Sequence, residues 1–172
     1  MRASATGQDR KMKDEGLKGR WSHTYAALDL GTNNCRLLVA KPDSAGFYVV
    51  DAFSRIVRLG EGLGSSNALS GHAMDRTIDA LRVCRSKIDR NGVTRIRAVA
   101  TEACRRAENG AAFVSRVRAE TDIDLEIIAP DEEAELALVG CSPLYDAPKE
   151  ADSYALLFDI GGGSTQITWL EL

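Results

Sequence analysis

Hydrophobic and polar positions along the chain predict mainly strands up to about residue 60 and a mixture of helices and strands after it. Runs rich in β-branched and aromatic residues indicate buried strands. They cover residues 24–30, 36–41, 47–59, 94–100 and 125–128. Apolar positions recur at helical spacing after Ser70, a suitable N-cap, and Asn91-Gly92 ends that helix. Further helices are expected over residues 101–109, 111–120 and 130–140.

The order of these elements predicts an α/β fold in which a mixed sheet is flanked by helices, the ribonuclease H-like pattern. Residues 1–21 are polar and of mixed charge, so we expect a mobile tail. Residues 22–141 would form a first lobe, and residues 142–153 a connector. Residues 154–172 would open a second, incomplete lobe with a hairpin. We therefore expect the N-terminal portion of a longer protein.

One device occurs twice, about 130 positions apart: an apolar strand ends in an aspartate, Asp29 or Asp159, and a turn of small residues follows. Such residues let backbone N–H groups converge on an oxyanion, because no bulky side chain intervenes. The turns consist of Gly31, Thr32, Asn33 and Asn34, and of Gly161, Gly162, Gly163, Ser164 and Thr165. Each aspartate could hold a divalent cation or a water. Two copies predict a phosphate clamp in a cleft between related lobes.

Composition and charge narrow the classes of partner. The 172 residues are 44% hydrophobic and 27% charged, which is typical of a soluble globular chain. No apolar run approaches the roughly 20 residues of a membrane span, and no secretion signal is evident, so we expect a cytoplasmic protein without a membrane partner. The net charge of -3 argues against indiscriminate nucleic-acid binding, so DNA is not an expected partner.

The four cysteines form no C-x-x-C pair, and only two histidines accompany them, which argues against a zinc site. Cys35 directly follows the first turn and invites interpretation as a nucleophile. A free cysteine is more often a small buried hydrophobic residue, and we favour that interpretation.

Five ordered motifs give the chain a specific resemblance to a known family. They are Asp29-Leu-Gly-Thr-Asn-Asn34, Arg58-Leu-Gly-Glu-Gly-Leu63, Ala100-Thr-Glu-Ala-Cys-Arg-Arg-Ala-Glu-Asn109, Asp131-Glu-Glu-Ala134 and Asp159-Ile-Gly-Gly-Gly-Ser-Thr165. From about Tyr25 to Leu172 the chain resembles the Ppx/GppA family, the exopolyphosphatases and guanosine pentaphosphate phosphohydrolases of the actin-like ATPase superfold.

This resemblance implies a phosphoanhydride hydrolase that removes terminal orthophosphate from inorganic polyphosphate, or the γ-phosphate from guanosine pentaphosphate. The two turns would grip phosphates, and Arg105 would bind a phosphate group. Asp29 and Asp159 would organise Mg²⁺ or water. Glu133 would be the general base that activates water, with the adjacent Glu132 as its rival. The resemblance also allows a homodimer of the full-length protein.

Two departures from the family pattern bear on function. Gln166 stands where relatives commonly carry an acidic residue, which weakens the expectation of tight Mg²⁺ binding. Pro130 replaces a common glycine, and Glu135 replaces a residue that is often basic, so substrate preference could differ. Two alternatives stay open: a nucleotide-dependent kinase or ATPase of the same superfold, and a phosphate-binding regulatory module without effective turnover. The chain alone could also be inactive.

Overall fold

The computed structural model of the chain describes residues 23–44, 46–142 and 154–171. The tail expected over residues 1–21 and all but the first residue of the expected connector lie outside these ranges.

A five-stranded sheet forms the centre of the larger part of the molecule, with strand order β3-β2-β1-β4-β5. The strands are β1 (Tyr25–Leu30), β2 (Asn34–Asp43), β3 (Gly46–Ile56), β4 (Arg95–Ala100) and β5 (Glu126–Ile127). The first three strands form an antiparallel meander, whereas β4 pairs in parallel with both β1 and β5. The mixed sheet expected from the order of elements is therefore confirmed.

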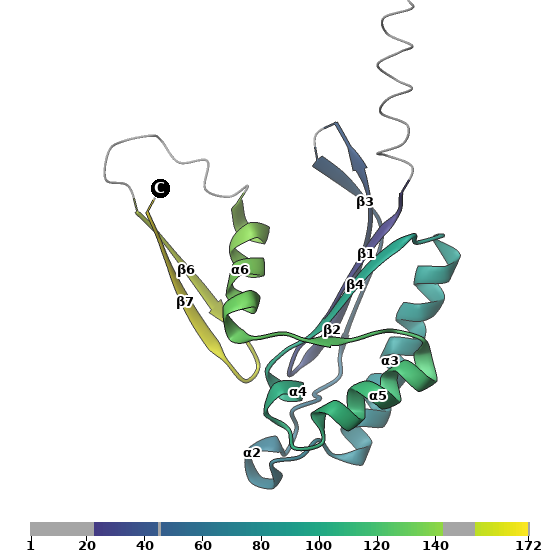
Figure 1. Cartoon of the computed structure of the whole chain (residues 1–172), viewed down its shortest axis with the longest axis vertical. Coiled ribbons are helices and arrows are strands. Elements are labelled where there is room, and N and C mark those ends of the chain that lie inside the picture. The colour runs from purple at the N-terminus through teal and green to yellow at the C-terminus, as the bar shows by residue number, and fades with distance from the viewer. Residues whose placement is uncertain (1–22, 45, 143–153, 172) are drawn as a thin grey trace, which may run out of the picture.

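Helices α3 (Gly71–Arg90) and α5 (Gly110–Thr121) cover one face of this sheet (Figure 1). Alternation along β1 explains why: Leu28 and Leu30 are buried in the same core as Leu81 of α3, while Asp29 points to the opposite, exposed face. The start of α3 follows the sequence expectation, because the Ser70 hydroxyl accepts a hydrogen bond from the Ala73 N–H at 3.2 Å.

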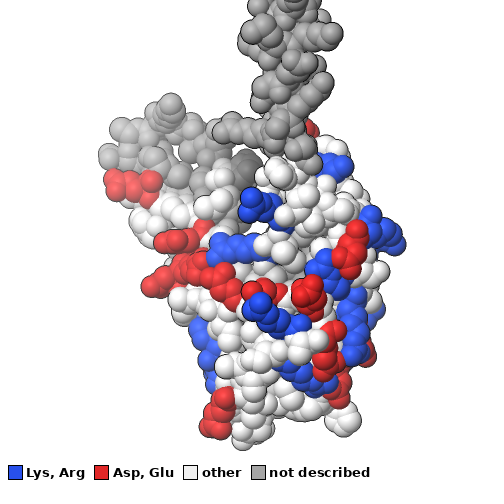
Figure 2. Space-filling view, turned by 45° about the vertical axis from the view of Figure 1, so that its right-hand side comes forward, with Lys and Arg blue, Asp and Glu red and all other residues white. Residues whose placement is uncertain are grey.

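Ion pairs join the two covering helices on their outer side. The Arg82 guanidinium lies 2.6 Å from Glu120, and the Arg116 guanidinium lies 2.7 Å from Asp75. Figure 2 shows Lys and Arg interspersed with Asp and Glu on the face that it presents. That face therefore carries charges of both signs rather than a field of one sign.

The sequence expectation differs from the structure between residues 57 and 66. The strand expected over 47–59 stops at Ile56, because the Val57 and Arg58 N–H groups turn to the Asn33 carbonyl oxygen, at 2.8 and 3.0 Å. Arg58 has a left-handed φ of 46°, which no continuing strand allows. The expected loop that follows contains a short helix, α2 (Leu63–Ser66).

The chain leaves the five-stranded sheet through α6 (Pro130–Cys141) and ends in a hairpin of β6 (Tyr154–Ile160) and β7 (Thr165–Glu171). This hairpin confirms the second strand-turn-strand unit. Figure 1 shows α6 and the hairpin standing to one side of the larger sheet, with the hairpin turn close to it. In the described part of the chain the two sheets share no strand pairing. No helix within the described ranges has both the length and the apolar character needed to cross a membrane.

Candidate functional site

The first turn is held by hydrogen bonds to its carbonyl groups. The Gly31 N–H closes the turn by donating to the Asn34 carbonyl oxygen at 2.9 Å. The Thr32 carbonyl oxygen accepts from the Gly60 N–H at 3.0 Å, and the Asn33 carbonyl oxygen accepts from the following loop. Among the described residues, no hydrogen bond uses the N–H groups of Thr32 and Asn33. These two donors are therefore available to an anion.

The second turn repeats this geometry at the same spacing. The Gly161 N–H donates to the Ser164 carbonyl oxygen at 2.8 Å, the counterpart of the bond that closes the first turn. Within the ranges that the structure describes, the N–H groups of Gly162 and Gly163 are likewise unused. The repetition seen in the sequence is therefore a repetition of backbone structure.

The two turns meet. A Cβ atom on Gly162 would lie 2.5 Å from Asn33 Nδ2, and one on Gly163 would lie 3.0 Å from Thr32 Oγ1. A real Cβ essentially never comes closer than 3.0 Å to a neighbour, so glycine at position 162 permits the close approach, and a Cβ at position 163 would be tightly packed. The turns thus face each other across the space between the two sheets.

A cavity of about 290 Å³ opens where the turns meet. Its lining includes most residues that the sequence singled out: Asp29, Gly31, Thr32, Asn33, Asn34, Glu133, Asp159, Gly161, Gly162 and Ser164. It does not include Arg105, Gly163 or Thr165. It adds Arg36 and Thr101, which the sequence analysis did not select.

Arg36 lies directly opposite Asp29 in the pairing of β2 with β1, so both side chains project from the same face of the sheet. The Arg36 charge acts on Asp29, and in the described part of the chain no closer ion pair or hydrogen bond engages the Arg36 side chain. The hairpin register could have revealed this residue from sequence, since the closing of the turn by Gly31 and Asn34 fixes which residues stand opposite each other.

Asp29 and Asp159 bring two negative charges into the cavity. Asp29 is accessible to solvent, but surrounding protein atoms restrict its hydration and raise its pKa. The Arg36 charge lowers that pKa, while the Asp159 charge raises it further. The pair is therefore close enough for mutual repulsion. No group of three or more His, Cys, Asp or Glu side chains in the described ranges has an arrangement suited to a metal ion.

Gln166 supplies a different feature beside this pair. It stands opposite Asp159 in the β6–β7 register. Its Oε1 atom is buried and has no hydrogen-bond partner among the described residues. An unpartnered buried amide oxygen is costly, and it is a type of ligand that hard cations accept.

Glu133 approaches the cavity from the first turn of α6 and is held by Arg105 of α4 (Glu102–Arg106). Its Oε2 atom accepts hydrogen bonds from both terminal nitrogens of Arg105, each at 3.2 Å. The Arg105 side chain also donates to the Ile128 carbonyl oxygen at 2.7 Å and to Glu102 at 2.9 Å. With 20% of its side chain exposed, against 54% for Arg106, Arg105 is not a solvated surface residue.

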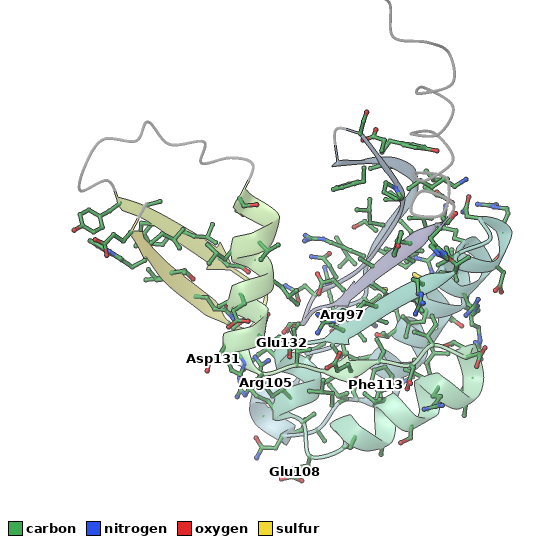
Figure 3. All side chains as sticks on the ribbon, turned by 45° about the horizontal axis from the view of Figure 1, so that its top comes forward. Arg97, Arg105, Glu108, Phe113, Asp131 and Glu132 are labelled. Atoms are coloured by element: carbon green, nitrogen blue, oxygen red, sulfur yellow. The ribbon has the colours of Figure 1, made fainter. Side chains whose placement is uncertain are left out.

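The side chain of the neighbouring Glu132 does not enter the cavity. It forms an ion pair with Arg97 of β4 and lines neither this cavity nor the larger one beside it. Figure 3 shows Arg97 and Glu132 close together near the end of α6 at which Asp131 and Arg105 also lie. Geometry therefore favours Glu133 over Glu132 as the carboxylate that faces a ligand.

A larger cavity of about 630 Å³ continues from the site along the open face of the five-stranded sheet. It shares Asp29, Arg36, Thr101, Glu133 and Asp159 with the smaller cavity. Its remaining lining is mostly apolar and comes from the open sheet face and from α6. The polar site is thus the end of a longer depression.

Cys35 does not belong to the site. It is fully buried, and its Sγ atom lies 3.9 Å from that of Cys84. The contact with the Cys84 thiol and burial together raise the pKa of Cys35, which disfavours the nucleophilic thiolate. The interpretation of Cys35 as a small buried hydrophobic residue is confirmed.

Comparisons with known proteins agree with this architecture. The Ppx/GppA phosphatase family matches residues 38–171, and the chain belongs to that family. The solved Ppx/GppA enzyme of Aquifex aeolicus is 30% identical with a TM-score of 0.75, over 87% of this chain and 48% of that one. An exopolyphosphatase from Cytophaga hutchinsonii is 28% identical with a TM-score of 0.76, over 87% of this chain and 51% of that one. The chain therefore spans about half the length of these relatives, and its larger sheet has their ribonuclease H-like fold.

Proposed function

We propose that the protein releases terminal orthophosphate from a phosphoanhydride chain, either inorganic polyphosphate or the 5′-phosphate chain of guanosine pentaphosphate. The observation that carries the proposal is the pair of facing turns: Thr32, Asn33 and Gly162, whose N–H groups are unused among the described residues, line a cavity together with Glu133. Converging N–H donors suit the oxygens of condensed phosphates. Membership of a phosphatase family supports hydrolysis as the reaction.

In the proposed reaction, Glu133 accepts a proton from a water molecule as its oxygen attacks the terminal phosphorus. The bridging P–O bond breaks, orthophosphate leaves, and the electron pair of that bond stays on the shortened chain. A positioned acid or base of this kind contributes roughly 10²- to 10⁴-fold to rate. The two turns, with the Arg36 guanidinium, would carry the phosphate charge during the transfer.

Mg²⁺ is the proposed cofactor. Asp29 and Asp159 are suitable ligands, because Mg²⁺ in phosphate-processing sites is commonly bound by one or two carboxylates together with water and substrate oxygens. The unpartnered Oε1 atom of Gln166 fits an additional oxygen ligand or a partner for a bound water. When bound, the cation would neutralise charge on the phosphate chain.

The experiment that tests the function compares substrates. The chain is incubated with Mg²⁺ and polyphosphate, guanosine pentaphosphate or ATP, and released orthophosphate is measured over time. Release from polyphosphate or guanosine pentaphosphate without any acceptor supports the proposal. Turnover of ATP alone, dependent on an acceptor, would support the kinase alternative instead.

A phosphate-binding role without turnover is the second candidate. Gln166 favours it, because a neutral amide replaces the third charge that would hold Mg²⁺ beside the two aspartates. Calorimetric titration with polyphosphate distinguishes this candidate. Binding without any phosphate release, in the presence of Mg²⁺ and with Glu133 intact, would support it.

A further inference from the structure

Glu102 lines neither cavity, but it contacts Arg105 and lies beside the second turn. Its Oε2 atom accepts a hydrogen bond from Arg105 at 2.9 Å, and its side chain is only 17% exposed. Its Cγ atom would stand 3.3 Å from a Cβ on Gly163, so it also packs against the second turn. We infer that Glu102 is a positioning residue, which holds the Arg105 guanidinium for a phosphoryl group. This inference rests on the proposed function.

The hydrogen bonds of Arg105 differ in a way that supports this role. Its bonds to the Ile128 carbonyl oxygen and to Glu102 are short, at 2.7 and 2.9 Å. Its two bonds to Glu133 are longer, at 3.2 Å each, and both end on the same oxygen atom. Glu133 is thus the partner that Arg105 exchanges most readily. A phosphoryl oxygen that takes its place leaves the guanidinium anchored by Glu102 and the backbone.

This exchange explains how Arg105 can serve a ligand although it does not line the cavity. In the structure its four terminal N–H bonds are directed to Ile128, Glu102 and Glu133. An incoming phosphate that displaces Glu133 gains two charge-assisted donors and frees the carboxylate to take a proton from water. Without Glu102, only the Ile128 carbonyl oxygen would hold the guanidinium when Glu133 moves, and its second terminal nitrogen would lose its fixed direction.

Removing the Glu102 charge changes phosphate affinity in opposite directions for a positioning residue and for a charge that merely lies nearby. Glu102 is negative and lies close to the proposed anion site, so its charge alone opposes phosphate binding. Neutralising a bystander would therefore strengthen binding. Neutralising a positioning residue weakens binding, because Arg105 loses a charge-assisted hydrogen bond that fixes its orientation.

The experiment measures tripolyphosphate binding to the 172-residue chain by calorimetry, at low salt. Glu102→Gln is expected to weaken binding by about five- to tenfold. Glu102→Asp keeps the charge but withdraws it by one methylene, and it is also expected to weaken binding. Glu108→Gln is the control: it removes one negative charge from an exposed side chain that forms no ion pair with Arg105 and lies at the outer end of the molecule in Figure 3, and binding should stay equal or tighten slightly.

A double-mutant cycle completes the test. In an Arg105→Gln background, Glu102→Gln should no longer weaken binding, since the side chain that it positions is absent. Melting temperatures show which variants are folded. If Glu102→Gln does not fold, Glu102→Asp is used for the test in its place. Unchanged or tighter binding by the folded Glu102 variants would overturn the inference alone. Absence of tripolyphosphate binding by the unmodified chain would overturn the proposed function, and this inference with it.

Discussion

The Asn33 side chain occupies the space next to Gly162 in which a Cβ atom would otherwise stand, 2.5 Å from its Nδ2 and 2.6 Å from its Cγ. This contact joins the two halves of the candidate site directly. We expect Gly162→Ala to push the Asn33 side chain out of its place between the turns and to weaken tripolyphosphate binding by about tenfold, since geometric placement of donors determines their value. Calorimetry measures the change.

The control for that substitution is Gly64→Ala. Gly64 lies in α2, and nothing stands within 4 Å of the position of its Cβ. Binding should be unaffected, and stability should stay equal or rise slightly because alanine favours helix. If Gly162→Ala bound tripolyphosphate as well as this control does, the contact between the turns would have no role in the site.

Glu133→Gln should reduce orthophosphate release by at least about 100-fold while leaving substrate binding nearly intact, because the amide keeps the shape but accepts no proton from water. Phosphate release and calorimetry on the same preparation separate these two effects. Glu132→Gln is the comparison, since Glu132 pairs with Arg97 and lines neither cavity. A larger loss of release from Glu132→Gln would transfer the role to that residue.

Gln166→Glu should strengthen Mg²⁺ binding, because it adds a third carboxylate to the pair formed by Asp29 and Asp159. Without a cation the same charge adds repulsion, so the variant should melt at a lower temperature than the unmodified chain. Added Mg²⁺ should raise its melting temperature more than it raises that of the unmodified chain. Identical responses of both proteins to Mg²⁺ would argue against a cation at this position.

Asp51 ties β3 to the end of α3 and gives stability a defined pH dependence. A hydrogen bond from Lys87, 2.7 Å away, is the main cause that lowers the pKa of Asp51 to about 2. A pKa below the unfolded value of roughly 4 means that this stabilisation is present above pH 4 and disappears as the pH falls toward 2. Asp51→Asn should therefore be less stable than the unmodified chain at pH 6.

Urea unfolding at a series of pH values measures this difference. The two proteins should converge between pH 4 and pH 2, as Asp51 becomes protonated in the unmodified chain. A stability difference that stayed constant over that interval would assign the loss to something other than the carboxylate charge. Asp79→Asn is a suitable control, because Asp79 forms an exposed pair within α3.

Much of the fold followed from local sequence signals. Alternating strands, the cap at Ser70 and the repeated aspartate-turn device all depend on residues close together in the chain, and each appears in the structure. The left-handed Arg58 carried no such signal. Its conformation follows from hydrogen bonds to Asn33, which lies on a separate turn.

The parts of the candidate site that consist of turns and strand ends were predictable from the sequence. Arg105 was expected to contact a phosphate, yet its partners come from α4, from the residue after β5 and from α6. Such a cluster depends on how distant segments pack, and periodicity does not encode it. Arg36 is the opposite case, because hairpin register alone would have placed it beside Asp29.

The separation of the two sheets affects the affinity for any ligand that binds both turns. Each turn belongs to its own hydrogen-bonded body, and neither body alone surrounds an anion. A ligand that accepts hydrogen bonds from both turns must hold the two sheets in one relative orientation. Its binding free energy therefore includes the cost of fixing that orientation. Substitutions that merely loosen α6 would then register as losses of affinity, although they touch no ligand atom.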